Sequence, residues 1–324
     1  MDPKTITQSA DRVLAQGNQD PKKTALFFAG VATVFSFVTT LLSFLLGTAA
    51  GNVGGLSGLA MRSLLESGQV VLSMAGSLLL PFWQAGFLFA ALRYAKGERV
   101  ENRSLLEGFR RWGAVLRLNI LISLMVTGVL MVCSYLATFI FFLSPFHDGI
   151  DAQMSALLET ENIVITPQIL GPMMPNLIWL ILMFLVALLM IGLPYYYRIR
   201  MSEFALMDGA PGAFAAVHNS KVLAMNNRMT MFRLDLSFWW YYLLQVAISL
   251  ITYGDVILNF FGVQLPVGED VAFWITYLIA LGGQFLLSYF FSLRYMTAYG
   301  QLYLQLKERF VKPITPPPSG TDYA

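Results

Sequence analysis

The chain has 324 residues, of which 56% are hydrophobic and only 12% are charged, and its formal net charge is +2. This composition leaves no separate soluble domain, and so small a net charge does not indicate nucleic-acid binding. The single cysteine, Cys133, excludes a disulfide or a thiolate metal site within one chain.

Six long stretches of the chain contain no charged residue: 24–61, 67–92, 118–146, 162–197, 236–254 and 271–293. Each can supply the roughly 20 apolar residues that a helix needs to cross a bilayer. Within the longer stretches we expect the spans at about 26–46, 70–92, 119–143 and 177–197. Because they are too long and too continuously apolar for barrel strands, the sequence predicts an all-α, polytopic membrane helical bundle with six transmembrane helices.

Basic residues gather on one side of these spans. Four precede the first span, seven lie in the loop between the second and third spans, five lie between the fourth and fifth, and four follow the last. The other loops contain only Arg62, and the stretch 144–176 is acidic, with Asp148, Asp151, Glu159 and Glu161. Lysine and arginine mark the cytoplasmic side, so we expect both termini in the cytoplasm.

These boundaries divide the chain into a cytoplasmic N-terminal segment, 1–23, a six-span membrane domain, 24–310, and a proline-rich tail, 311–324, which we expect to be disordered. The first span is too long for a signal peptide and predicts an uncleaved anchor. Gly47, Gly51 and Gly55 at its end favour a loop over a close helix contact.

The two basic loops between spans also indicate an internal duplication. The first connector, between the second and third spans, and the second connector, between the fourth and fifth, match without a gap at an offset of 116 residues. The match places Ser104 on Ser220, Arg117 on Arg233 and Asn119 on Asp235. Two such halves would be related by a pseudo-two-fold axis along the membrane normal.

The first connector has the pattern of an amphipathic helix. Leu105, Phe109, Trp112 and Leu116 share one face, with Glu107, Arg110 and Arg111 opposite. We interpret it as an interfacial helix at the inner headgroups, in preference to a lipid sensor or a docking surface for a partner. The second connector is interrupted at 208–212 and is the weaker amphipath.

A set of residues in and around the connectors resembles the signature of a known family. They are 195–198, 204–208, Ala213, Ser220, Lys221, Asn226, Asn227 and 233–239, together with 105–111 in the first connector. The chain is similar in these positions to an uncharacterised bacterial integral-membrane family, domain of unknown function number nine-seven-five. It is more distantly similar to the membrane domain of glycerophosphodiester phosphodiesterases, whose catalytic domain is absent here. The resemblance implies a bacterial plasma-membrane location and six spans, but no activity.

No catalytic or metal-binding pattern emerges from the sequence. His147 and His218 fall in loops on opposite predicted sides of the membrane, so they cannot form a paired metal site. The run 55–59 misses the G-x-S-x-G pattern at its last residue. We therefore expect no enzyme activity, cofactor or metal.

Polar residues in the spans are the better candidates for a functional site. Arg117, Asn119, Arg233 and Asp235 lie at the inner ends of the third and fifth spans. We hypothesise that Arg117 and Asp235 form an ion pair that closes the cytoplasmic side, while the alternative is that both arginines extend to the headgroups. Gln84, Gln245 and Gln284 either line a polar cavity or hydrogen-bond between helices.

Three classes of function remain after these exclusions. We favour a non-enzymatic lipid-binding or accessory membrane protein, for which membrane lipids, or a partner membrane protein, are the expected partners. A transporter of a small solute or lipid is the alternative, and a lipid-modifying enzyme comes third. The sequence leaves the oligomeric state open.

Overall fold

The computed structural model describes residues 2–16, 21–52, 59–145, 167–254, 257 and 268–311. Every regular element in these ranges is a helix. Five helices are long and apolar enough to cross a membrane, or six if the bent pair α11 (Arg228–Ser237) and α12 (Trp239–Thr252) is one span. The predicted all-α fold class is confirmed.

The chain folds into two compact units. The first contains Met1–Asn119, Met201–Tyr242 and Gln284–Ala324, and the second contains Ile120–Arg200 and Leu243–Gly283.

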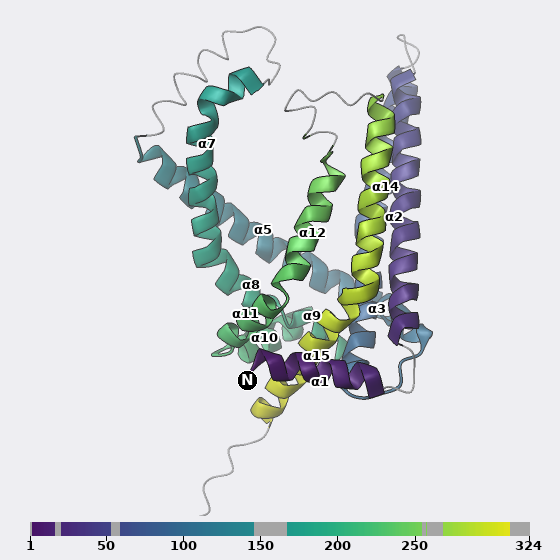
Figure 1. The fold of residues 1–324 in the computed structure, drawn as a ribbon, viewed down its shortest axis with the longest axis vertical. Coiled ribbons are helices and arrows are strands. Elements are labelled where there is room, and N and C mark those ends of the chain that lie inside the picture. The colour runs from purple at the N-terminus through teal and green to yellow at the C-terminus, as the bar shows by residue number, and fades with distance from the viewer. Residues whose placement is uncertain are drawn as a thin grey trace, which may run out of the picture. The chain divides into compact units, whose positions relative to one another are not determined.

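In the first unit, α2 (Pro21–Asn52) and α3 (Leu59–Ala95) pack along each other through aromatic side chains (Figure 1). The Phe28 ring stacks on Phe87 with the centroids 3.9 Å apart, and on Trp83 at 5.9 Å. The Trp83 indole N–H also donates a hydrogen bond to the Phe28 carbonyl, at 3.2 Å. Stacking and the satisfied indole fix this end of α3 against α2.

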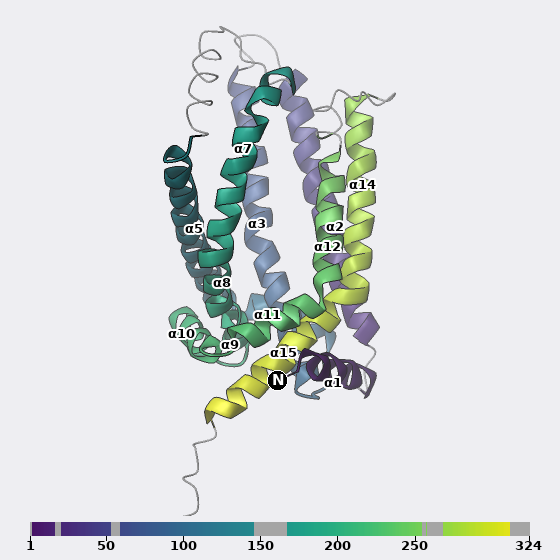
Figure 2. The same ribbon diagram turned by 60° about the vertical axis from the view of Figure 1, so that its left-hand side comes forward.

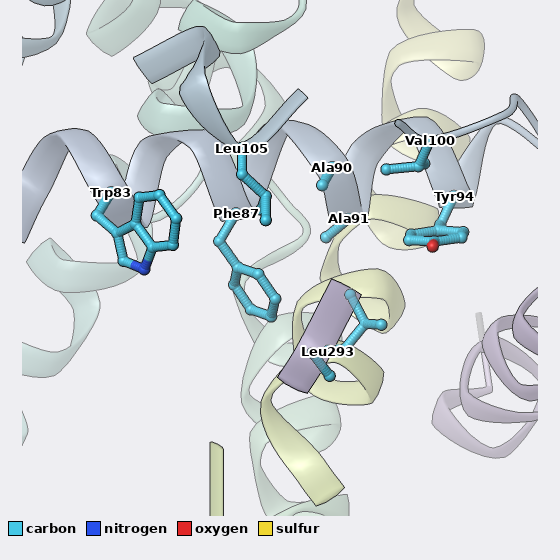
Figure 3. Close-up of a cluster of buried hydrophobic side chains, with 9 residues drawn as sticks. Trp83, Phe87, Ala90, Ala91, Tyr94, Val100, Leu105 and Leu293 are labelled. Atoms are coloured by element: carbon cyan, nitrogen blue, oxygen red, sulfur yellow. The ribbon is translucent and has the colours of Figure 1, made fainter. Parts of the chain in front are cut away.

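Figure 3 shows the buried cluster that continues from this contact, in which Leu105 from the first connector and Leu293 approach the α3 side chains Phe87 and Ala91. Leu105 lies in the short helix η2 (Asn102–Leu106), which α4 (Glu107–Arg110) follows. The cluster therefore joins the first connector to α3.

Two glycines allow the first connector to lie directly on α3. A Cβ atom added to Gly86 would lie 1.8 Å from the Leu105 carbonyl oxygen, and one added to Gly108 would lie 1.9 Å from the Phe82 carbonyl oxygen. Real carbon atoms cannot approach backbone atoms so closely. The close approach therefore depends on the absence of a side chain at both positions.

This packing changes the interpretation of the predicted interfacial helix. Helix α4 ends at Arg110, and α5 (Trp112–Phe142) begins two residues later, so the predicted face is not one continuous helix. Leu105 is fully buried against protein, whereas Trp112 is 62% exposed. Phe109 stays near the surface and contacts Phe82 at 5.6 Å between ring centroids. The glycine contacts draw the start of the predicted face into the protein core.

The rest of the first unit is a layer of short helices, which we call the connector layer. It comprises α1 (Pro3–Gln16), the end of α3, η2, α4, α9 (Ser202–Met207), α10 (Ala213–Ala224), α11 and α15 (Leu293–Val311). Figures 1 and 2 show α1 lying across α15. Ile6 and Ala10 of α1 are fully buried, and Asp11 forms a bidentate ion pair with Arg294, with both N···O distances 2.7 Å.

The second unit contains most of α5, together with α7 (Pro167–Ala187), a π-helical turn at Leu188–Gly192, and α8 (Leu193–Ile199). The buried Cys133 thiol of α5 donates to the Ala187 carbonyl of α7, at 3.6 Å. Parts of α12 and α14 (Glu269–Leu287) also belong to this unit and pack where Gly283 faces Ile248.

The spans follow the predicted windows with two differences. At the fifth window, α11 and α12 meet at a bend of 65° in place of one straight helix. The last helix continues past the predicted span, through a π-helical turn at Ser288–Ser292 and along α15.

The two connectors that the sequence predicts to be duplicated differ in backbone. Arg117 lies within the unbroken α5, whereas Arg233 and Asp235 lie in α11 just before its bend. The acidic stretch with Asp148, Asp151, Glu159 and Glu161, His147, Gly55 and the proline-rich tail all lie outside the described residues.

Candidate functional site

One face of α15 carries polar residues at intervals of four: Tyr295, Tyr299, Tyr303 and Lys307. Residues at i and i+4 are neighbours on a helix surface, so these four form a continuous line, which we call the tyrosine stripe. The stripe binds two carboxylates of the second connector, Asp235 at one end and Asp208 at the other. The stripe thereby links one helix to two separate carboxylates of the same connector.

Asp208 is positioned by the way helix α9 ends. The Ala210 N–H donates to the Ala205 carbonyl at 3.0 Å, and the Gly209 N–H donates to the Leu206 carbonyl at 3.2 Å. These two bonds form a Schellman motif, in which the residue after the C-cap adopts a left-handed conformation. Gly209 has φ of 104°, which only glycine adopts readily. The motif makes Asp208 the C-cap and fixes its carboxyl group.

Lys96 is positioned by the same device at the end of α3. The Glu98 N–H donates to the Arg93 carbonyl, the Gly97 N–H donates to the Tyr94 carbonyl, and Gly97 has φ of 72°. A cation is also favourable at a helix C-terminus because the helix dipole is negative there.

Asp208 is almost completely enclosed by its partners. Its carboxylate oxygens accept from the Lys96 ammonium at 2.6 Å, the Lys307 ammonium at 2.5 Å and the Tyr303 hydroxyl at 3.0 Å. The Asp208 side chain is 5% exposed, whereas the Lys96 and Lys307 side chains are 33% and 46% exposed. Burial acts to raise the pKa of Asp208, but the hydrogen bonds from Lys307, Lys96 and Tyr303 and the charge of Lys96 outweigh it, so the pKa lies below its ordinary value.

At the other end of the stripe, the Asp235 carboxylate accepts hydrogen bonds from three tyrosine hydroxyls. Its Oδ1 accepts from the hydroxyl of Tyr299 at 2.5 Å, Tyr242 at 2.7 Å and Tyr295 at 3.3 Å. Figure 2 shows α11, which carries Asp235, meeting α15. Tyr242 lies seven residues after Asp235, and the bend at Phe238 brings its hydroxyl back to the Asp235 carboxylate. The Phe238 ring packs edge-on against Tyr295.

The predicted ion pair between Arg117 and Asp235 is not formed. Arg117 is exposed and has no ion-pair partner among the residues that the structure describes, while Asp235 faces the phenols of α15. Arg233 is exposed, and the Asn119 amide bonds to the Val115 carbonyl within its own helix, at 3.1 Å. The hypothesis had the correct acidic residue and the wrong partner, because a long arginine side chain at a helix end reaches solvent at little cost.

The three span glutamines differ in environment. Gln84 is exposed, whereas Gln245 and Gln284 are half-buried and have polar partners. None of them lines the two grooves described next.

Two grooves run along the membrane-length helices, one in each unit, and a smaller apolar one of about 140 Å³ lies in the first unit beside Phe35, Trp83 and Phe109. In the first unit, a groove of about 370 Å³ between α2 and α3 is lined by hydroxyl groups, including Ser36, Thr39, Thr40, Ser43 and Ser73. In the second unit, a groove of about 270 Å³ between α5 and the turn from α7 into α8 is apolar. Sequence reasoning missed both, since hydroxyl and aliphatic residues do not interrupt an uncharged window.

The two carboxylates of the stripe are engaged in hydrogen bonds, and neither lines one of these grooves. His218 is exposed on α10, and the described residues contain no group of three or more His, Cys, Asp or Glu side chains that could hold a metal ion. The arrangement is suited to holding the connector layer together. The four-residue spacing of the stripe was the sequence signal that could have revealed it.

Comparison of the chain with protein-family models, with curated proteins and with solved structures finds no match.

Proposed function

We propose that this chain is a non-enzymatic, six-span membrane protein that binds membrane lipid, with the connector layer and both termini on the cytoplasmic side of a bacterial plasma membrane. The distribution of basic residues supports the orientation, since 20 of 21 lie in segments on one predicted side. The resemblance to domain of unknown function nine-seven-five supports the bacterial origin and the span number.

The lipid-binding proposal rests on one observation: the acidic groups of the tyrosine stripe and the apolar groove lie in different parts of the chain. The acidic residues of the stripe are bound by lysine and tyrosine donors within the connector layer, whereas the groove of the second unit is lined by aliphatic side chains. A catalytic site needs titratable groups beside the space that receives the substrate. A groove of this kind, open along apolar helices, is suited to an acyl chain.

Native mass spectrometry of the protein in a mild detergent, followed by extraction and identification of the retained molecules, tests the proposal. A discrete phospholipid at a fixed stoichiometry is the expected result. Only bulk lipid together with a stably associated protein would replace lipid binding with an accessory or scaffold role.

A transporter is the second candidate, because the hydroxyl-lined groove places polar groups between two membrane-length helices. Serine and threonine hydroxyls can replace part of the hydration shell of a polar solute. Uptake into proteoliposomes distinguishes the two candidates. A transporter should take up solute faster than empty vesicles do, and Thr40→Leu in the hydroxyl-lined groove should abolish that uptake. A binding protein should show no uptake above empty vesicles.

A further inference from the structure

The apolar groove of the second unit has a shape that the helix contacts explain. At one end of the groove, α5 and α7 are in direct contact. There the Cys133 thiol donates to the Ala187 carbonyl, and both residues are buried. Small side chains at this point permit the close approach. From this contact the groove extends toward the start of α5. Its walls include Val126 and Leu130 of α5, and Leu188 and Leu193 of the segment that follows α7.

The π-helical turn at Leu188–Gly192 follows Ala187 directly. A π-helical turn accommodates one extra residue, which changes the helix face presented to a neighbour, and such turns are frequent at functional sites. Gly192 belongs to the groove wall, and a Cβ added there would lie 2.7 Å from the Leu188 Cδ1. A side chain at residue 192 would therefore displace Leu188, so glycine at this position preserves the wall.

The end of the groove away from Cys133 changes from aliphatic to aromatic and then to basic. Tyr195 and Tyr196 line this end. The Arg200 guanidinium donates to the Tyr196 hydroxyl and lies 5.1 Å from the centre of the Tyr196 ring. Arg200 follows Tyr196 by four residues, or about 6 Å along a helix. Tyrosine and arginine at the end of a membrane helix are typical of headgroup depth.

The volume of about 270 Å³ is appropriate for part of a flexible chain. It is nearly twice the roughly 150 Å³ of an apolar protein cavity that binds one benzene molecule. Within a bilayer the lipid tails are as apolar as leucine, so apolar contact alone does not select a ligand. The groove would instead be occupied because an empty one forfeits dispersion contacts along its walls. Selectivity must come from the basic end.

We propose that the groove holds one acyl chain of an anionic phospholipid whose phosphate contacts Arg200. The inference rests on the proposed lipid-binding function and names its site and ligand class. The aliphatic walls contact the chain, the tyrosines lie at the glycerol level, and the guanidinium binds the phosphate with charge-assisted hydrogen bonds. The phosphate adds to the contacts that Arg200 already makes with Tyr196.

The test is native mass spectrometry with added phosphatidylglycerol or phosphatidylcholine of identical acyl chains. The wild-type protein should retain one phosphatidylglycerol in preference to phosphatidylcholine, because the choline cation of phosphatidylcholine offsets the charge of its phosphate and is repelled by Arg200. Leu130→Trp, which fills the groove, should lose this lipid. Leu124→Trp is the matched control, because Leu124 lies on the same helix, is 71% exposed and does not line the groove. Thermal unfolding of both variants verifies that each remains folded.

The headgroup is tested separately at Arg200. Arg200→Gln should lower the preference for phosphatidylglycerol by about fivefold, as expected for one basic residue beside an anionic headgroup, whereas Arg200→Lys should keep most of it. If the wild-type protein retains no lipid, the proposed function fails. If Leu130→Trp retains phosphatidylglycerol as well as Leu124→Trp does, the groove is the wrong site but lipid binding stands. Equal retention of the two lipids by the wild-type protein would refute the headgroup assignment.

Discussion

Asp208→Asn tests whether the charged end of the tyrosine stripe holds the connector layer together. The substitution preserves the size of the side chain and removes its negative charge. Lys96 and Lys307, which bind the two carboxylate oxygens of Asp208, would then face each other without compensation. The asparagine amide would also direct N–H groups toward one ammonium group, where no acceptor is present.

The expected loss of stability follows from burial. Hydrogen bonds to charged groups contribute about 1.5–3 kcal/mol each when they are buried. Asp208 is 5% exposed, but the two lysines are 33% and 46% exposed, so solvent screens part of each interaction. We expect a net loss of about 2–3 kcal/mol, which for a chain of 324 residues corresponds to a fall in Tm of about 3–5 °C.

Thermal unfolding in detergent measures this effect, and Asp11→Asn is the matched control. The ion pair of Asp11 with Arg294 has both side chains about equally exposed, at 45% and 42%, so its loss should cost about 0–1 kcal/mol. Adding Lys307→Met to Asp208→Asn removes the uncompensated cation and should restore part of the Tm. If Asp208→Asn lowers the Tm no more than Asp11→Asn does, the reasoning is refuted.

The pH dependence provides an independent measurement. The pKa of Asp208 is lower in the folded protein than its ordinary value, so folding favours the ionised form. The stabilising contribution is therefore complete above the unfolded pKa of about 3.9 and is lost as the pH falls through the folded pKa. Below about pH 4, the wild-type Tm should approach that of Asp208→Asn.

Two other substitutions test the packing and the corrected partner. Gly86→Ala places a methyl group against a backbone carbonyl at 1.8 Å and should cost about 3 kcal/mol or more, measured as Tm and folded yield, whereas Gly128→Ala in open space should stabilise by up to about 1 kcal/mol. Asp235→Arg should cost about 2 kcal/mol or more because three phenols lose their acceptor, and adding Arg117→Asp should not restore the Tm. Restoration by the charge exchange would reinstate the predicted ion pair.

The membrane-length helices could be predicted because an uncharged window directly reflects the solvent around it. The window 118–146 and helix α5 agree closely for this reason. The fifth window, 236–254, contains no proline or other residue that predicts the bend at Phe238. The bend is accompanied by contacts with α15, in which Tyr242 and Phe238 approach Tyr295. Hydropathy contains no information on such partners.

The first connector shows a different limit. Its periodicity predicts one apolar face, but periodicity does not distinguish lipid from protein as the cover of that face. Gly86 and Gly108 decide the matter for Leu105, since they allow a backbone contact that excludes lipid. Gly86 lies in a predicted span and Gly108 in a connector, so only the folded structure brings the two segments together.

The candidate site was predicted at one residue and missed at another. Asp235 was selected because a charge at the end of a span needs a partner, and in the structure three phenol groups donate hydrogen bonds to it. The error lay in choosing an opposite charge, since three neutral phenols from two helices satisfy the same carboxylate. Asp208 was read only as part of a helix-breaking run, and its role depends on Lys96 and Lys307, which are 112 and 99 residues away.

The direction of the Asp208 pKa shift favours a structural role for this residue. A general acid or base works best when its pKa lies near the operating pH, and enzymes raise carboxyl pKa values to reach it. The contacts of Asp208 move its pKa the opposite way and keep the group ionised. Because Asp208 and the apolar groove lie in different compact units, Asp208→Asn should lower the Tm while the folded protein still retains phosphatidylglycerol. Loss of the lipid without loss of stability would assign Asp208 to the binding site instead.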